Sequence, residues 1–207
     1  MKRVCDKIHV GINPYDDFQP FPYDGFGWNS NDTSFKDVIE SVKPNLIVEV
    51  GTWLGASAVN MANICFDLGI KREELEIVCV DTWLGSVEHF SMGSLTRQNG
   101  RPVIYEQFIS NIIHKELTDV ITPFPIDSVN AHECFKGWNI QPDMIYIDAA
   151  HDYQSVKLDV FVWSQVLRSG GWMLFDDWHH EPIKRAVYEV FGQDKVFEVG
   201  GKAAWVK

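Results

Sequence analysis

LIVEVGTWLGASAVNM, residues 46–61, is the stretch that decides the fold. An apolar run that contains Glu49 is followed by a predicted turn at Gly51 and Gly55. The residues after this turn have the periodicity of a helix. This pattern predicts a loop of small residues between a buried strand and a helix N-terminus, where backbone N–H groups attract a carboxylate or phosphate. A dinucleotide-binding loop needs a glycine two residues after the first, and Trp53 occupies that position. The stretch therefore argues against a dinucleotide-binding loop.

Five short apolar runs, each bounded by turn-forming residues, predict strands at 46–50, 77–81, 121–124, 144–148 and 172–176. The runs are apolar on both faces, which indicates a parallel sheet covered by helices, and so an α/β fold. Pro123 and Pro125 remove hydrogen-bond donors, so the strand at 121–124 is expected at an edge of the sheet. Residues 195–199 and 202–206 flank Gly200-Gly201 and predict a closing hairpin. Two of the predicted helical stripes are Ala58, Met61, Ala62 and Cys65, and Val156, Val160, Trp163 and Leu167.

Length and composition predict one domain, 1–207, because 207 residues with 45% apolar content can bury a full core. Two segments interrupt the alternation of strands and helices. Segment 1–33 is rich in proline and aromatic residues, and segment 82–102 contains several glycines with little periodicity. Long loops in a compact domain are often lids or binding loops. We expect 82–102 to be a lid, and 1–33 either to close over the substrate as well or to pack on the flank of the sheet.

Charge and cysteine usage restrict the partners. The formal net charge is −11 and no block of Lys or Arg occurs, which argues against a nucleic-acid substrate and favours a small molecule. No apolar run approaches the roughly 20 residues of a membrane span, so no membrane partner is expected. The cysteines are scattered without a Cys-x-x-Cys pair, as is typical of thiols in a reducing compartment, and we expect a cytoplasmic protein. The sequence is compatible with a monomer and with a homo-oligomer.

The second motif is IVCVDTW, residues 77–83, in which an acid ends the second strand. A carboxylate at this place can accept hydrogen bonds from both ribose hydroxyls of a bound nucleoside. Asp81 is therefore the candidate ribose ligand, with Thr82 and Trp83 directly after it. An aspartate after a strand can equally cap a turn.

Three acids follow the fourth and fifth strands. Asp148 is the fifth residue of MIYIDAAH, residues 144–151. Asp176 and Asp177 lie in LFDDW, residues 174–178. Open parallel sheets bind ligands at the carboxyl ends of their strands. Carboxylates crowded there repel one another unless a cation is present, and oxygen ligands suit Mg²⁺ or Mn²⁺. The alternative is that Asp177 caps a turn and Asp148 binds a cofactor.

The stretch from Gly51 to Ala62 resembles the class I S-adenosylmethionine-dependent methyltransferases, especially the catechol O-methyltransferase type, through Gly55-x-Ser57-Ala58-Val59-x-Met61-Ala62. The resemblance implies a Rossmann-like, doubly wound, mostly parallel sheet of seven strands that ends in an antiparallel hairpin. It also implies S-adenosylmethionine (SAM) as cofactor and suggests that Asp127 and Ser128 reach the adenine, although Ser128 could equally be a helix N-cap. The implied cofactor-binding residues are Glu49, Gly51, Thr52, Gly55, Ser57, Asp81, Thr82, Trp83, Asp127, Ser128 and Asp148.

The acids after strands four and five resemble the metal site of the catechol and macrocin O-methyltransferase groups. The implied metal ligands are Asp148, Asp176 and Asp177. Catechol-type enzymes hold a catalytic lysine where this chain has His151, whose ordinary pKa lies near neutrality, so we expect His151 to be the base. The second acid of the macrocin-type Asp-x-Asp is missing here. As alternatives, His151 begins the next helix or binds substrate, and a less favoured iron site can be drawn from His151, Asp176 and His180.

These features together predict a SAM-dependent, divalent-metal-assisted O-methyltransferase that acts on a hydroxyl of a small molecule. The first alternative is a metal-independent methyltransferase acting on oxygen or nitrogen, in which the Asp pair is structural. The second is a SAM-binding protein without catalytic activity.

Overall fold

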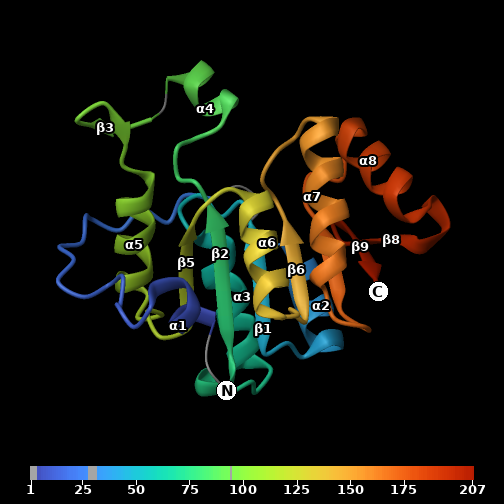
Figure 1. Cartoon of the computed structure of the whole chain (residues 1–207), viewed down its shortest axis with the longest axis horizontal. Coiled ribbons are helices and arrows are strands. Elements are labelled where there is room, and N and C mark those ends of the chain that lie inside the picture. Colours follow the sequence, from blue (N-terminus) through green and yellow to red (C-terminus); the bar gives the residue numbers. More distant parts are fainter. Residues whose placement is uncertain (1–3, 28–31, 94) are drawn as a thin grey trace.

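Seven strands form one sheet at the centre of the molecule (Figure 1). The computed structural model describes residues 4–27, 32–93 and 95–207. The strand order is β5 (Ile121–Pro125), β2 (Glu76–Asp81), β1 (Leu46–Val50), β6 (Met144–Ile147), β7 (Trp172–Phe175), β9 (Lys202–Val206) and β8 (Val196–Val199). The first five strands are parallel, and β9 runs antiparallel to both β7 and β8. The predicted fold class is confirmed.

The strand positions agree with the sequence pattern within a residue. The proline-containing strand β5 lies at one edge of the sheet, as predicted, and the hairpin β8–β9 closes the other edge. Strands β6 and β7 each end one residue earlier than expected, at Ile147 and Phe175. Asp148 and Asp176 are therefore the first residues after two neighbouring parallel strands.

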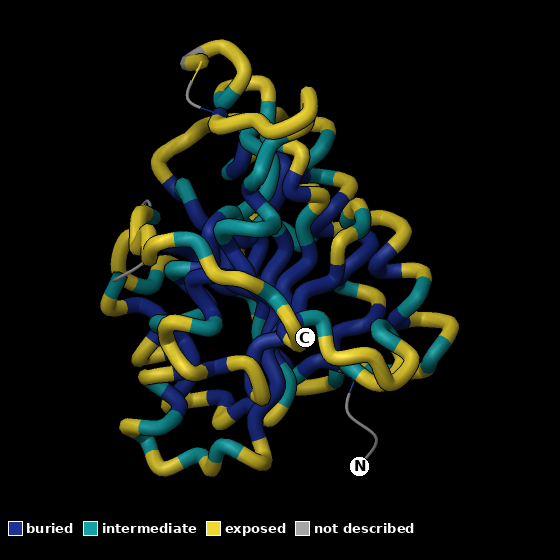
Figure 2. The backbone as a smooth tube through the Cα atoms, turned by 90° about the vertical axis from the view of Figure 1, so that its left-hand side faces the viewer, coloured by how far each residue is buried: buried dark blue, intermediate teal, exposed yellow. Residues whose placement is uncertain are grey.

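Helices cover both faces of the sheet, as Figure 1 shows. One face packs against α2 (Ser34–Val42), α3 (Ala56–Asp67) and α5 (Ile104–His114), and the other against α1 (Val4–His9), α6 (Ser128–Trp138), α7 (Tyr153–Val166) and α8 (Glu181–Phe191). Both predicted stripes are buried in these layers. Buried segments gather in the centre of Figure 2 and exposed loops surround them. Among the described residues, no helix combines the length and apolar character needed to cross a membrane.

The described part of segment 1–33 packs along the flank of the sheet and on α5. The Glu76 carboxylate accepts the first N–H groups of α1 at 2.8 Å. The Tyr15 hydroxyl donates to the β5 backbone, and the Asp24 N–H donates to the Asn111 side chain at 3.0 Å. Phe26 lines the large cavity described below, and closure of this segment over a substrate stays a prediction. Residues 28–31 lie outside the described residues.

Segment 82–102, called the lid segment below, contains more structure than its composition indicates. It holds α4 (Val87–Met92) and an antiparallel pair, β3 (Arg97–Gln98) and β4 (Arg101–Pro102). A short 3-10 helix, η1 (Arg72–Glu74), precedes β2, and another, η2 (Gln193–Lys195), precedes β8. In Figure 1, α4 and β3 stand above the carboxyl ends of the strands. The lid segment is therefore placed over the edge where ligands bind in sheets of this kind.

Candidate active site

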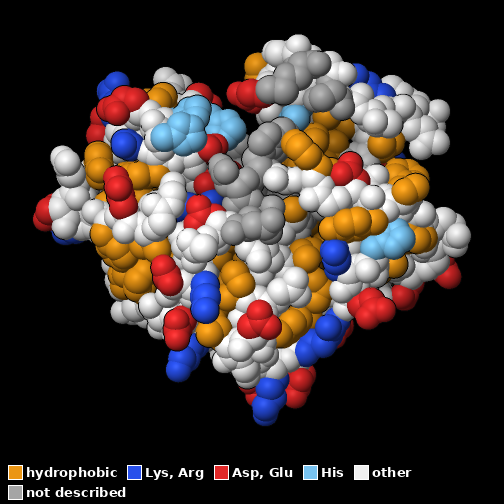
Figure 3. Space-filling model, turned by 180° about the vertical axis from the view of Figure 1, so that it is seen from behind, with side chains coloured by type: hydrophobic (Ala, Val, Ile, Leu, Met, Phe, Trp, Pro, Cys, Tyr) orange, Lys and Arg blue, Asp and Glu red, His pale blue; other side chains and the backbone are white. Residues whose placement is uncertain are grey.

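A cavity of about 500 Å³ lies at the carboxyl ends of the central strands, between the sheet and the lid segment. Figure 3 shows the surface hollowed at the top, between a group of histidine side chains and the lid segment. The lining comes from the loops after β1, β2, β5, β6 and β7, and from residues 26–27. The segment after β2 contributes Gly85, Ser86, Glu88 and His89. The lining includes these predicted site residues: Gly51, Thr52, Ser57, Asp81, Thr82, Asp127, Ser128, Asp148, His151, Asp176 and Asp177.

The β1–α3 loop contains two glycines that no other residue can replace without distortion. Gly51 has φ +85°, and a Cβ there would lie 2.4 Å from the backbone oxygen of Asp148. Gly55 has φ +86° and precedes α3, and a Cβ there would lie 2.9 Å from the ring of Phe108. Positive φ together with such close approach admits only glycine. The loop therefore brings its backbone against the end of β6 and narrows the cavity floor.

Glu49 lies behind the loop and does not line the cavity. Its carboxylate is fully buried and accepts hydrogen bonds from the hydroxyls of Thr52 and Ser57. The thiol of Cys79 on β2 donates to the same carboxylate at 3.6 Å. Burial raises the pKa of Glu49 to about 7, although the hydrogen bonds act in the opposite direction. In this structure Glu49 braces the nucleoside loop.

Asp81 lines the cavity and ties two loops together. Its carboxylate accepts the backbone N–H groups of Thr52 and Trp53 at 3.0 Å and of Trp83 at 2.7 Å. Burial raises the pKa of Asp81, and these N–H groups oppose the shift. Thr82 is exposed at the cavity, whereas the side chain of Trp83 is buried against Phe108 and is not part of the lining.

Asp127 and Ser128 reach the cavity from the β5–α6 turn. Asp127 is the N-cap of α6 and accepts the Asn130 N–H at 3.0 Å, so Ser128 is the first helical residue and not the cap. The Ser128 hydroxyl donates to Asp159 at 2.5 Å and accepts from the Trp163 indole at 2.9 Å. Both partners belong to α7, so this hydroxyl joins two helices.

Asp148 and Asp176 are linked beneath the cavity by residues that the sequence analysis missed. The fully buried Lys202 pairs with Asp176 and donates to the Tyr146 hydroxyl at 3.0 Å. That hydroxyl in turn donates to Asp148 at 3.1 Å. The strand register offers a signal for Lys202: Phe175 on β7 faces Ala203 on β9, so the next pair is Asp176 with Lys202. This pairing can be predicted from the sequence only when the order of the strands, with β9 beside β7, is known.

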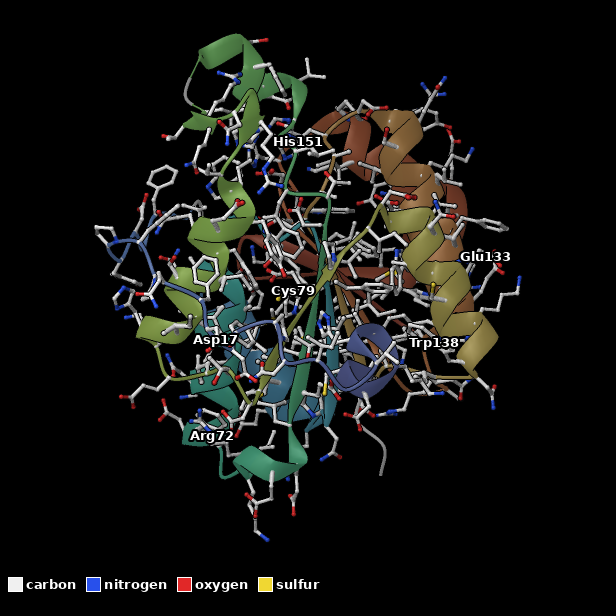
Figure 4. The ribbon with its side chains drawn as sticks, turned by 60° about the vertical axis from the view of Figure 1, so that its left-hand side comes forward. Asp17, Arg72, Cys79, Glu133, Trp138 and His151 are labelled. Atoms are coloured by element: carbon white, nitrogen blue, oxygen red, sulfur yellow. The ribbon has the colours of Figure 1, made fainter. Side chains whose placement is uncertain are left out.

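His151 and Asp177 form the outer part of the site. The His151 Nε2 lies 2.8 Å from an Asp177 oxygen, which raises the pKa of His151 and lowers that of Asp177. Burial and the nearby charge of Asp176 raise the pKa of Asp148 well above its usual range. Figure 4 shows His151 beside the lid segment, above Cys79 in the middle of the sheet. The carboxylates are thus crowded in the manner that a bound cation relieves.

Two groups of candidate metal ligands occur among the described residues. Asp148, His151 and Asp177 offer ligand atoms within 4.8 Å of one another, and so do Asp177, His179 and His180. Asp176 belongs to neither group and pairs with Lys202. The structure therefore brings two of the three predicted ligands, Asp148 and Asp177, together with His151. The alternative iron set of His151, Asp176 and His180 does not form such a group in the described part of the chain.

A protein-family profile described as a methyltransferase domain matches residues 48–178. Among curated proteins, no sequence matches this chain. Similar solved structures include an O-methyltransferase from Bacillus cereus in complex with SAH, at TM-score 0.57 and 15% identity over 100% of this chain and 92% of that one. The O-methyltransferase TomG from Streptomyces achromogenes, in complex with SAM, gives 0.57 and 13% over 84% and 78%. CalS11, named as a TDP-rhamnose 3'-O-methyltransferase, gives 0.58 and 16% over 84% and 77%.

The matched profile covers the larger part of the 207 residues, and the chain therefore belongs to this methyltransferase family. The resemblance to class I SAM-dependent methyltransferases is confirmed, and the protein is an enzyme of that class. The structural neighbours share less than a fifth of their residues with this chain, so their contribution is the fold.

Proposed function

We propose that the protein transfers the methyl group of SAM to a hydroxyl of a small molecule with the help of a divalent cation. One observation carries the proposal: a single cavity contains both the nucleoside loop and the carboxylates with His151. Cofactor and acceptor would therefore meet in one space, where positioning alone can supply roughly 7–11 kcal/mol of the rate enhancement. The O-methyltransferase names of the structural neighbours favour oxygen as the accepting atom.

The cofactor half of the cavity would be formed by the glycine loop and by Asp81. The backbone of Gly51 and Thr52 approaches the cavity closely, and the Asp81 carboxylate keeps oxygen lone pairs beyond its three N–H contacts. Thr82, Asp127 and the backbone of Ser128 lie further along the same wall. Glu49, Ser57, Gly55 and Trp83 would act by shaping the loop.

A Mg²⁺ or Mn²⁺ ion would be held by Asp148, Asp176 and Asp177 at the ends of β6 and β7. Bound there, the ion would hold acceptor oxygens and lower the pKa of the hydroxyl to be methylated. Burial and the charge of Asp176 both disfavour ionisation of Asp148, and a bound cation would offset them.

His151 is proposed as the base. Its Nε2 contacts Asp177, so the imidazole stands beside the proposed acceptor position. A cation held by Asp177 would compete with His151 for that carboxylate, which would leave the Nε2 atom to accept the proton of the acceptor hydroxyl. Removal of such a base typically lowers the turnover rate by roughly 10²–10⁴-fold.

Metal-independent methyl transfer is the second candidate, and a specific observation favours it. Lys202 pairs with Asp176 and His151 pairs with Asp177, so two of the three carboxylates already have a counter-charge from the chain itself. In that case the Asp pair would be structural and His151 alone would take the proton.

Chelation and substitution together separate the two candidates. With a vicinal diol such as a catechol as acceptor, EDTA and Asp176→Ala should each abolish methyl transfer, and added Mg²⁺ should restore the EDTA-treated enzyme only. Calorimetry with SAH should show nearly unchanged cofactor affinity for the variant. Methylation that survives both treatments would replace the metal mechanism by the metal-independent one.

The cellular setting is part of the proposal. All four cysteines are thiols in the structure, which supports a reducing compartment such as the cytoplasm. The net charge of −11 supports a small-molecule acceptor and not a nucleic acid.

A further inference from the structure

The charged residues that line the cavity are acidic. Six of its residues are carboxylic acids, and among the described residues no Lys or Arg lines it: Asp81, Glu88, Asp127, Asp148, Asp176 and Asp177. Residues 28–31, which lie next to the lining in the chain, read WNSN and add no basic side chain. Lys202 is fully buried behind Asp176, so its ammonium is screened from any ligand in the cavity.

These carboxylates differ in their hydrogen-bond and ion-pair partners within the chain. Asp81 and Asp127 accept backbone N–H groups, and Asp148 and Asp176 belong to the network with Lys202. Glu88 is different, because it sits on α4 in the lid segment and its side chain is exposed at the cavity.

Glu88 and His151 line the same cavity, Glu88 from the lid segment and His151 from the loop after β6. A hydrogen bond from Ser86 lowers the pKa of the Glu88 carboxyl. An acceptor bound between the lid segment and His151 would therefore meet a carboxylate on the side away from the sheet.

We propose that the acceptor is uncharged or positively charged, that it carries no phosphate or carboxylate, and that Glu88 contacts its cationic group where one is present. The inference rests on the proposed function and specifies the substrate class of the same site. With a cation held by Asp148, Asp176 and Asp177 and the cofactor at Asp81 and Asp127, Glu88 is the lining carboxylate that would face the acceptor. An anionic group on the acceptor would meet this carboxylate in a partly enclosed site, and no guanidinium or ammonium among the described lining residues would receive it.

Three catechols that share the vicinal diol and differ in side-chain charge test the inference. The wild-type enzyme with SAM and Mg²⁺ should give kcat/KM values that are higher for dopamine and 4-methylcatechol than for 3,4-dihydroxyphenylacetate, by roughly tenfold or more. The difference should shrink as ionic strength rises, because salt screens the charges at the cavity mouth. A dihydroxyphenylacetate value equal to or above that of 4-methylcatechol would overturn the inference.

Charge variants of the lid segment assign the effect to Glu88. Glu88→Gln should lower the preference for dopamine over dihydroxyphenylacetate, and Glu88→Lys should lower it further, with the KM for SAM unchanged. Glu73→Gln is the matched control, because Glu73 is an exposed acid on η1, outside the cavity lining, and should leave the preference as it is. An unchanged preference in both Glu88 variants would remove Glu88 from the proposal.

Binding measurements separate this inference from the proposed reaction. The SAH-bound protein is titrated with the same three catechols by calorimetry, without turnover. Catechols that bind in the predicted order without being methylated would contradict the proposed reaction and leave the charge preference supported. Methylation of all three at equal rates would support the reaction and overturn the charge preference, and absence of binding by all three would overturn the inference as well.

Discussion

Single residues at the cavity floor shape the proposed cofactor site. Gly51 combines a positive φ with a backbone contact to Asp148 that leaves no space for a side chain. A matched glycine exists outside the cavity lining: Gly69 has φ +84° and nothing within 4 Å of its Cβ position. Comparison of substitutions at Gly51 and Gly69 therefore separates the effect of the steric clash from that of the positive φ.

Gly51→Ala should abolish SAH binding, because the added Cβ displaces the β1–α3 loop from the end of β6. Gly69→Ala should keep the affinity while losing roughly 1 kcal/mol of stability from the same strained φ. Calorimetry with SAH and urea unfolding measure the two effects. Equal SAH affinity in the Gly51 variant would remove this loop from the cofactor site.

The contact between His151 and Asp177 predicts a pH-dependent contribution to stability. The folded-state pKa of His151 is raised, so its contribution is complete below the ordinary value of about 6.5 and is lost as pH rises through the folded-state value. The pKa of Asp177 is lowered, so its contribution is present above about 3.9 and is lost as pH falls through the folded-state value.

In EDTA, His151→Gln should therefore destabilise the protein most between about pH 4 and 6.5, and less at pH 8. The loss should stay below about 1 kcal/mol, because 40% of the His151 side chain is exposed. Urea unfolding at several pH values measures it, with His114→Gln as a control on the distant helix α5. A loss that is constant with pH would contradict the assigned pair.

At the scale of elements, one histidine couples the lid segment to the cofactor loop. The Nδ1 of His89 lies 2.8 Å from the Ser86 hydroxyl and accepts the Ser86 N–H at 3.0 Å, which closes the first turn of α4. The ring of His89 also stacks on Trp53 of the β1–α3 loop, with centroids 3.8 Å apart and planes at 4°. Movement of the loop is thus transmitted to the lid segment.

His89→Ala should loosen α4, and loss of a cap worth about 1 kcal/mol corresponds to roughly fivefold faster amide exchange over residues 87–92. Added SAH should slow this exchange in the wild type and much less in the variant. Ser91→Ala is the control on the same helix, because the Ser91 hydroxyl bonds only within α4, to the Val87 oxygen. Equal protection by SAH in both variants would contradict the coupling.

Elements with strong local signals were predictable from the sequence, and contacts that depend on strand order were not. Prolines placed β5 at the edge, and the glycine spacing identified the loop after β1. Helix α4 was missed because six residues are too few for a periodic signal. The contact of Glu49 with Cys79 and the Lys202 network join residues distant in sequence, so no local pattern reports them.

At the scale of the whole molecule, the closing hairpin contributes to the chemistry as well as to the sheet. Lys202 on β9 is fully buried against Asp176, which is itself only 6% exposed. Removal of one partner from a buried ion pair leaves an uncompensated charge, at a cost of roughly 3–5 kcal/mol.

Lys202→Met should lower the free energy of unfolding by about that amount in EDTA, and Mg²⁺ should restore part of it, because a cation bound by the carboxylates replaces the lost ammonium. Lys195→Met, at an exposed position just before β8, should have little effect. Urea unfolding with and without Mg²⁺ provides the measurement. Equal losses in the two variants would show that the buried pair contributes little.

The position of Lys202 also sets an order of events during synthesis. Residues 46–177, which supply the nucleoside loop and all the clustered acids, leave the ribosome before residue 202 does. Until β9 docks beside β7, the nascent chain holds Asp148 and Asp176 without their ammonium partner. We therefore expect a newly made chain to complete the proposed reaction centre only when its last strand is in place and the whole sheet has formed.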